Sequence, residues 1–250
     1  MAEATRTETV TSGQGTWFTT THWSLILNAQ DTSSPLAAAA LEKLCRAYWY
    51  PLYVYVRRQG EDEESAKDLT QGFFVRLLEK RYLAQVQREK GKFRSFLLAS
   101  LKHFLSDERD KARAQKRGGG QTFVSLDDST SEERYRLEPV ETMDAEKLFE
   151  RRWALTLLEQ ARTRLKEEYL EGGKSSLYDR LKVFEGGDKN GPPYTQVAAE
   201  LGLTESGVKS AVFRLRQRYR ELVREEVANT VESPEEVDGE IRYLISIISG

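Results

Sequence analysis

The chain has 250 residues, 39% of them hydrophobic and 31% charged, and a formal net charge of -2 at pH 7. That composition can bury one sizeable core or two small ones, and it lacks the roughly 20 consecutive apolar residues that span a bilayer. Because residues 1–15 are polar, Cys45 is the single cysteine, and His22 and His103 have no metal-ligand spacing, we expect a cytoplasmic protein without disulfide, metal or cofactor.

The first half of the chain predicts a small helical domain. After an arm of residues 1–33 with a short apolar pattern from Trp23 to Leu27, a helix is expected to begin at Pro35 and run through Tyr48. Two further helices have apolar residues at three- and four-residue spacing. These residues are Ala66, Leu69, Phe73, Phe74, Leu77 and Leu78 in one helix and Phe93, Phe96, Leu97, Leu101, Phe104 and Leu105 in the other. We assign residues 34–117 to this domain.

Charge is segregated along the chain. Residues 88–117 carry ten cations against four acids, a net charge of +6, and residues 205–224 carry six against two, a net charge of +4. Both stretches could neutralise phosphates. Between them, residues 118–143 begin with three glycines and are acidic, with few periodic apolar residues, so we expect a flexible, solvated linker.

The second half predicts another helical domain, residues 144–228, followed by a tail of residues 229–250. A long helix is expected from Leu148 to a stop at Gly172, and a short one follows from Leu177 to Phe184. Tyr194 to Leu201 then forms a helix that ends at Gly202. Thr204 can cap the next helix, which completes a helix-turn-helix pattern. With no sustained period-two alternation, the fold class is all-α: two small helical domains joined by a flexible linker.

The helix after Thr204 has two distinct faces at about 100° per residue. Val208, Val212, Leu215 and Tyr219 fall on one side, and the other side mixes small polar, aromatic and basic groups, namely Ser206, Lys209, Ser210, Phe213, Arg214 and Gln217. Small side chains permit close approach to a major groove, cations reach guanine edges or phosphate, and an aromatic ring can contact a thymine methyl. The alternative is a helical hairpin with an ordinary solvated cationic face.

Two separated segments resemble the sigma-70-type transcription initiation factors, particularly the two-domain extracytoplasmic-function branch. YTQVAAELGLTESGVKSAVFRLR, residues 194–216, is similar to the domain that reads the minus-35 promoter element. SAKDLTQGFFVRL, residues 65–77, is similar to the helix that binds core RNA polymerase, and FRSFL, residues 93–97, together with Asp107 resembles the helix that recognises the minus-10 element.

The resemblance implies roles for particular residues. It places Lys209, Ser210, Phe213 and Arg214 at the minus-35 element, and the outward face of the helix adds Ser206 and Gln217 to this set. It places Lys92, Arg94, Phe96, His103, Asp107 and Lys111 at the minus-10 element, beside a base-flipping loop near residues 87–92. It places Asp68, Gln71 and Phe74 at the polymerase. The chain departs from the family at Gly72, where an acid is usual, at His103, where asparagine is common, and at Ala211, where arginine is common. It also lacks the usual Leu-Pro start before Tyr194.

Two features outside these segments each have two readings. The tail carries Ile241, Leu244, Ile245 and Ile248 on one face, so it packs on its own second domain or serves as a docking or autoinhibitory element for a regulator. The aromatic cluster Trp49, Tyr50, Tyr53 and Tyr55 is better read as core than as a surface for stacking bases.

The sequence therefore predicts a sigma factor, with core RNA polymerase and promoter DNA as partners and an anti-sigma factor as a possible further one. The acidic run Glu61 to Glu64 has no accompanying nucleophile or base, so we expect no enzymatic activity. One alternative is a helix-turn-helix regulator that acts without polymerase. Another is a helical regulatory adaptor.

Overall fold

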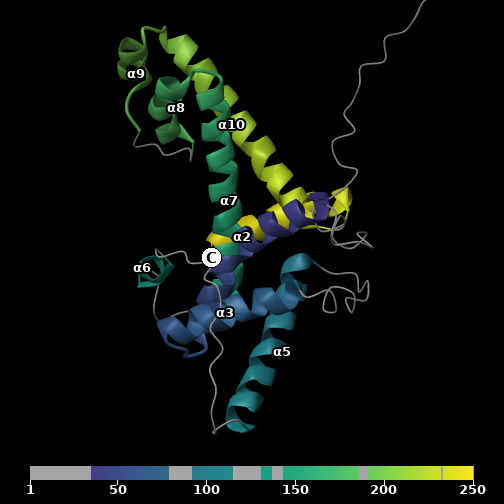
Figure 1. The fold of residues 1–250 in the computed structure, drawn as a ribbon. Helices are drawn as coiled ribbons and strands as arrows, with labels where there is room; N and C mark the ends of the chain where they lie inside the picture. Colours follow the sequence, from purple (N-terminus) through teal and green to yellow (C-terminus); the bar gives the residue numbers. More distant parts are fainter. Residues whose placement is uncertain are drawn as a thin grey trace, which may run out of the picture.

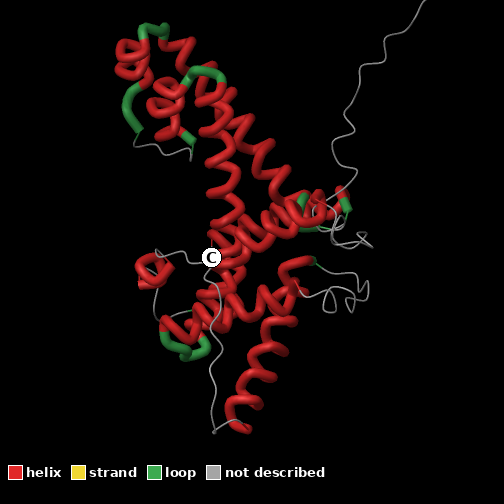
Figure 2. The backbone as a smooth tube through the Cα atoms, in the orientation of Figure 1, coloured by secondary structure: helices red, strands yellow, loops and turns green. Residues whose placement is uncertain are grey.

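The computed structural model describes residues 35–78, 92–114, 131–136, 143–185, 191–231 and 233–249. Regular structure in these residues is entirely helical (Figure 2), so the all-α prediction is confirmed for this part of the chain. The expected arm around Trp23 and the expected base-flipping loop before Lys92 lie outside the described residues.

The helices follow one another in the order drawn in Figure 1. They are α2 (Pro35–Arg58), α3 (Glu63–Leu78), α5 (Phe93–Ala114), α6 (Ser131–Arg136), α7 (Ala145–Glu171), α8 (Ser175–Leu181), the 3-10 helix η1 (Lys182–Phe184), α9 (Tyr194–Leu201), α10 (Glu205–Ala228), the 3-10 helix η2 (Pro234–Glu236) and α11 (Val237–Ser249). Helix α2 begins at the expected Pro35 but continues past Tyr48, through Pro51, to Arg58.

The first of two hydrophobic clusters joins helices from both halves of the chain. Its largest fully buried side chains include Tyr48 and Tyr53 of α2, Phe73 of α3, Phe93 of α5 and Trp153 of α7. The ends of α10 and α11 complete it with Val227 and Leu244, among others. The core interpretation of the aromatic cluster is confirmed, because Tyr50, Tyr53 and Tyr55 are buried and Trp49 packs against them.

The second cluster lies at the other end of the two long helices α7 and α10. It contains Ala161 and Leu165 of α7, Tyr178 of α8, Val197 of α9 and Val212 of α10, together with their buried neighbours. Figure 1 shows α7 running from α2 to the α8 and α9 end. Helix α7 therefore contributes to both clusters, and the expected domain start at residue 144 does not separate them.

Ion pairs along the α7 and α10 contact hold these two helices together. Arg218 reaches Glu168 at 2.7 Å, and Arg164 reaches Glu225 and Glu226, each at 2.6 Å. The hydrogen bond from Arg218 lowers the pKa of Glu168. Arg164 and Arg218 are therefore engaged in contacts within the fold.

Part of the acidic linker is ordered against the first cluster, which corrects the prediction of a solvated connector. In α6, Glu132 is 7% exposed. Its carboxylate accepts a hydrogen bond from the Tyr53 hydroxyl at 2.5 Å and two from the Arg57 guanidinium at 2.8 and 3.1 Å. The guanidinium also lies 4.7 Å from the centre of the Tyr135 ring. The sequence of the linker does not reveal this contact, because the partners of Glu132 lie on α2, far away along the chain.

The tail forms α11, which packs on α7 and α10. Val237 and Leu244 are buried there, so the prediction that this amphipathic segment packs on its own chain is confirmed. Of the helices that the structure describes, none combines the length and the apolar character needed to cross a bilayer.

Candidate nucleic-acid interface

The segment α9, turn and α10 is built by local signals in the sequence. Gly202 ends α9 in the left-handed region at φ 64°, a conformation that favours glycine. Thr204 then caps α10, since its hydroxyl accepts a hydrogen bond from the Gly207 amide at 3.0 Å. Between them, the Leu203 amide donates to the Ala198 carbonyl at 2.9 Å. The turn thus sets the direction of α10 relative to α9.

One face of α10 is buried as the helical spacing predicts. Val208, Val212 and Leu215 lie in the second cluster with residues of α7, α8 and α9. Ala211 is also buried, at 5% exposed. An arginine, common at this position in the sigma-70 family, would have to leave this packed surface, so the small residue follows from the packing.

The opposite face of α10 is open. All six residues expected at the minus-35 element are exposed, namely Ser206, Lys209, Ser210, Phe213, Arg214 and Gln217. Phe213 is 66% exposed, the highest value among the exposed large hydrophobic residues of the described chain. An exposed ring costs little when it stands alone, but here it lies between small polar side chains and cations. That mixture suits a DNA groove better than an apolar protein partner.

The cations of α10 divide into two groups. Arg216 donates to the Phe184 carbonyl at 2.8 Å and Arg218 to Glu168, so both support the fold. Lys209 is exposed and pairs with Glu205 of the previous turn at 2.6 Å, a hydrogen bond that raises the pKa of Lys209. Arg214 is exposed and makes no ion pair with a described residue. Arg220, seven residues after Phe213, is also exposed and makes no ion pair with a described residue. This side of α10 therefore holds two guanidinium groups outside ion pairs and one lysine in a weak surface pair.

The residues expected at the minus-10 element do not form one open surface. Lys92 and Arg94 pair with the buried Glu240 of α11, and Arg94 is only 4% exposed. Phe96 is half-buried. The other three, His103, Asp107 and Lys111, are exposed. Asp107 pairs with Arg76 at 2.9 Å and Lys111 with Glu108 at 2.8 Å.

Of the three residues predicted to contact the polymerase, one is exposed and two are buried. Asp68 is exposed on α3, whereas Gln71 is 7% and Phe74 is 1% exposed. Phe74 stacks on Trp49 with 5.8 Å between ring centres. The prediction that Gln71 and Phe74 contact the polymerase directly is therefore corrected, because both side chains are buried in the packing of α3. Gly72 lies where α3 approaches α5, since a Cβ there would meet the Phe104 ring at 3.4 Å.

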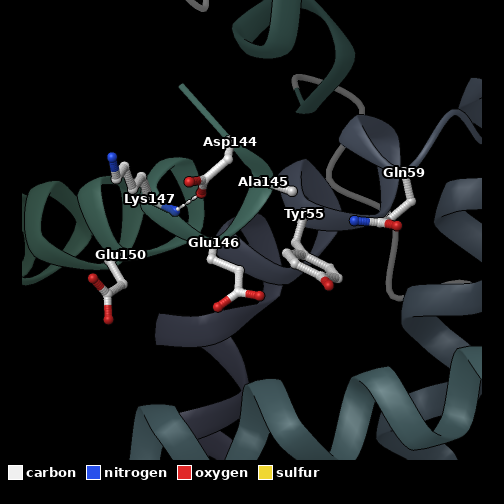
Figure 3. Close-up of a pocket in the computed structure, with 7 residues that line it drawn as sticks. All are labelled: Tyr55, Gln59, Asp144, Ala145, Glu146, Lys147 and Glu150. Carbon is white, nitrogen blue, oxygen red and sulfur yellow. Dashed lines mark hydrogen bonds between the residues drawn. The ribbon is translucent and has the colours of Figure 1, made fainter. Parts of the chain in front are cut away.

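An open hollow lies where α2 ends and α7 begins (Figure 3). Three carboxylates and one lysine line it from the α7 side, namely Asp144, Glu146, Glu150 and Lys147, with Tyr55 and Gln59 on the α2 side. Asp144 caps α7 by accepting from the Lys147 amide at 2.8 Å, and Glu146 pairs with Lys102 at 2.5 Å. Carboxylates repel phosphates and these two already have partners, so this hollow does not fit a nucleic acid.

Sequence reasoning missed three residues around Arg94, namely Trp153, Glu240 and Tyr243. Arg94 lies 4.6 Å from the Trp153 ring centre and 4.5 Å from that of Tyr243. One signal was present in the tail: Glu240 lies three residues after Val237 and four before Leu244, on the face that the apolar spacing predicts to be buried. A carboxylate on a buried face requires a cationic partner.

Comparisons with protein-family models, with curated proteins and with solved structures find no match for this chain. The functional argument therefore depends on the geometry of the chain itself.

Proposed function

We propose that the protein is a sigma-type transcription initiation factor, which brings core RNA polymerase to promoters whose upstream element is read by α10. In this proposal Lys209 and Arg214 contact phosphates or guanine edges and Phe213 contacts a base methyl group. Chemistry belongs to the polymerase, and this chain supplies binding and positioning.

The observation that carries the proposal is the open face of α10. Six residues that the sequence assigned to DNA are exposed together, while Val208, Val212 and Leu215 on the reverse side are buried. The Gly202 turn and the Thr204 cap fix the start of this helix, as readout of base edges by the N-terminal part of a recognition helix requires.

The polymerase part of the proposal depends on α3. Asp68 is exposed there, three residues before the buried Gln71 and six before the buried Phe74. Burial of these two neighbours anchors α3 on the core and leaves Asp68 as the group that a partner can reach. The sigma resemblance assigns this position to the polymerase clamp.

Co-elution of the purified chain with bacterial core RNA polymerase tests this proposal. We expect a complex that Asp68→Ala weakens at least tenfold. Glu63→Ala is the matched control, because it removes a partly exposed carboxylate from another face of the same helix. Absence of a complex with the cognate core enzyme, or equal weakening by both substitutions, would contradict the polymerase-binding role.

A helix-turn-helix regulator that acts without polymerase is the second candidate. It is favoured by the burial of Gln71 and Phe74, which leaves only one of the three expected polymerase contacts exposed. This candidate predicts specific binding to duplex DNA by the chain alone, reduced by Arg214→Ala and unaffected by Asp68→Ala. The sigma proposal predicts that both substitutions reduce promoter binding by the complex with polymerase.

A further inference from the structure

A buried carboxylate of the tail occupies a cationic site at the start of α5. Glu240 is 1% exposed. Its Oε2 lies 2.6 Å from the Lys92 Nζ, and its Oε1 pairs with the Arg94 guanidinium. Burial of a charge is costly unless it is paired, so these contacts hold α11 in one position against α5.

Two aromatic rings enclose the same guanidinium. Arg94 lies between Trp153 of α7 and Tyr243 of α11, at 4.6 and 4.5 Å from the ring centres. The Tyr243 hydroxyl donates to Glu150, and Lys92 lies 4.8 Å from the centre of the Tyr243 ring. Helix α11 therefore supplies the buried anion and one of the two rings, whereas α5 and α7 supply the cations and the other ring. Helix α7 also supplies a second, more exposed carboxylate, because the Glu150 Oε1 lies 3.8 Å from the Arg94 Nε.

The site without α11 has the chemistry of a single-strand binding site. Guanidinium and ammonium groups bind a phosphate oxygen as readily as a carboxylate oxygen. Cations beside an aromatic ring are the usual means of holding an unpaired nucleic-acid strand. Glu240 would then take the place of a backbone phosphate and Tyr243 that of a stacked base.

We infer that α11 is a displaceable internal ligand, and that its release opens the site formed by Lys92, Arg94 and Trp153 to the backbone of single-stranded DNA. The inference rests on the proposed function, because opened promoter DNA would be the strand. Displacement would also expose Val237 and Leu244, which are buried in the first cluster. The closed state therefore dominates until a ligand with higher affinity for the open state shifts the population.

Fluorescence anisotropy with a labelled oligothymidylate of about 20 nucleotides tests this on the full chain. Glu240→Gln keeps the shape of the side chain but removes the charge that competes with phosphate, so we expect binding at least fivefold tighter than wild type. Asp238→Asn is the matched control, since it removes an exposed partner of Arg224 from the same helix, and it should leave binding unchanged. Adding Arg94→Gln to Glu240→Gln should abolish the gain.

Hydrogen exchange of the wild-type chain provides a second measurement that needs no variant. Saturating oligothymidylate should increase amide exchange across residues 237–249. Unchanged exchange in α11, or a folded Glu240→Gln protein that binds no tighter than wild type, would overturn the inference. Neither assay contains polymerase or depends on the open face of α10. Failure here thus leaves the proposed function standing, and failure of polymerase co-elution leaves these results interpretable.

Discussion

The segments around α5 and on α10 are both rich in cations, but they differ in how many of these cations are held in ion pairs. All five cations between Lys92 and Lys111 pair with carboxylates, four of which belong to distant segments: Glu61, Glu146, Glu150 and Glu240. On α10, Arg214 points outward without such a partner among the described residues. A run of cations thus indicates a capacity to bind phosphate, and the remainder of the fold determines whether that capacity is free.

The ion pairs made by α5 also differ in how deeply they are buried. Arg94 and Glu240 are 4% and 1% exposed, whereas Arg109 and Glu61, 3.5 Å apart, are 46% and 29% exposed. Exposed pairs contribute little because water and salt screen them, while removal of one partner from a buried pair leaves an uncompensated charge. The start of α5 is therefore a structural centre of the molecule, and its later turns are an ordinary charged surface.

Arg94→Ala is expected to have the largest effect on stability. It would leave the buried Glu240 with the half-exposed Lys92 as its remaining cationic partner among the described residues, and it would remove the cation between Trp153 and Tyr243. We expect a cost of about 3 kcal/mol in the free energy of unfolding. Urea denaturation followed by circular dichroism measures this quantity. Arg109→Ala on the same helix should cost below about 0.5 kcal/mol. Equal losses of stability in the two variants would contradict the claim that the buried ion pair contributes more than the exposed one.

Glu132→Gln should have the next largest effect and should change the response to acid. Burial disfavours the charged form of Glu132, but hydrogen bonds from Arg57 and Tyr53 outweigh it and lower the pKa of this carboxyl. A lowered pKa contributes stability that is present above the unfolded pKa of about 4.3 and is lost as the pH falls through the folded value. Loss of these charged hydrogen bonds at pH 7 should cost about 1.5–3 kcal/mol.

Thermal unfolding between pH 7 and pH 3 tests the contribution of Glu132. The wild-type melting temperature should fall more steeply below about pH 5 than that of the Gln variant, so the two curves should converge in acid. Parallel curves would mean that α6 does not depend on the ionised carboxylate.

Arg214→Ala should leave the fold intact and reduce DNA affinity. If Arg214 contacts a base edge, the substitution should cost about 1–3 kcal/mol in binding free energy. If Arg214 contacts a phosphate, the substitution should lower the slope of log affinity against log salt concentration by about one. Anisotropy titrations with duplex DNA at several salt concentrations separate the two contacts. Arg218→Ala provides the comparison on the same helix, because Arg218 pairs with Glu168 and should affect stability more than affinity.

Thr204→Ala should have the smallest effect. Loss of the hydrogen bond from the Gly207 amide should cost about 1 kcal/mol in the free energy of unfolding. Thr204→Ser retains the cap and should restore most of the stability in the same denaturation experiment. No loss on Thr204→Ala would mean that the turn alone sets the start of α10.

The sequence predicts α10 better than it predicts the surroundings of α5, for a physical reason. The buried and open faces of α10 follow from a period of 3.6 residues, and its start follows from Gly202 and Thr204, all within a short segment. The burial of Phe74 depends on Trp49 of α2, and the ion pair of Arg94 depends on Glu240, at the far end of the chain. Local periodicity carries no information about such distant partners.

The central claim is that the open face of α10 reads DNA sequence, and selection from a random duplex pool tests it most directly. The full chain would be offered the pool alone and with core RNA polymerase, in parallel with the Arg214→Ala variant. We predict enrichment of one short motif by the wild type in at least one condition, with preference lost at one base pair in the variant. Absence of enrichment in both conditions, or an identical motif from the variant, would contradict the claim.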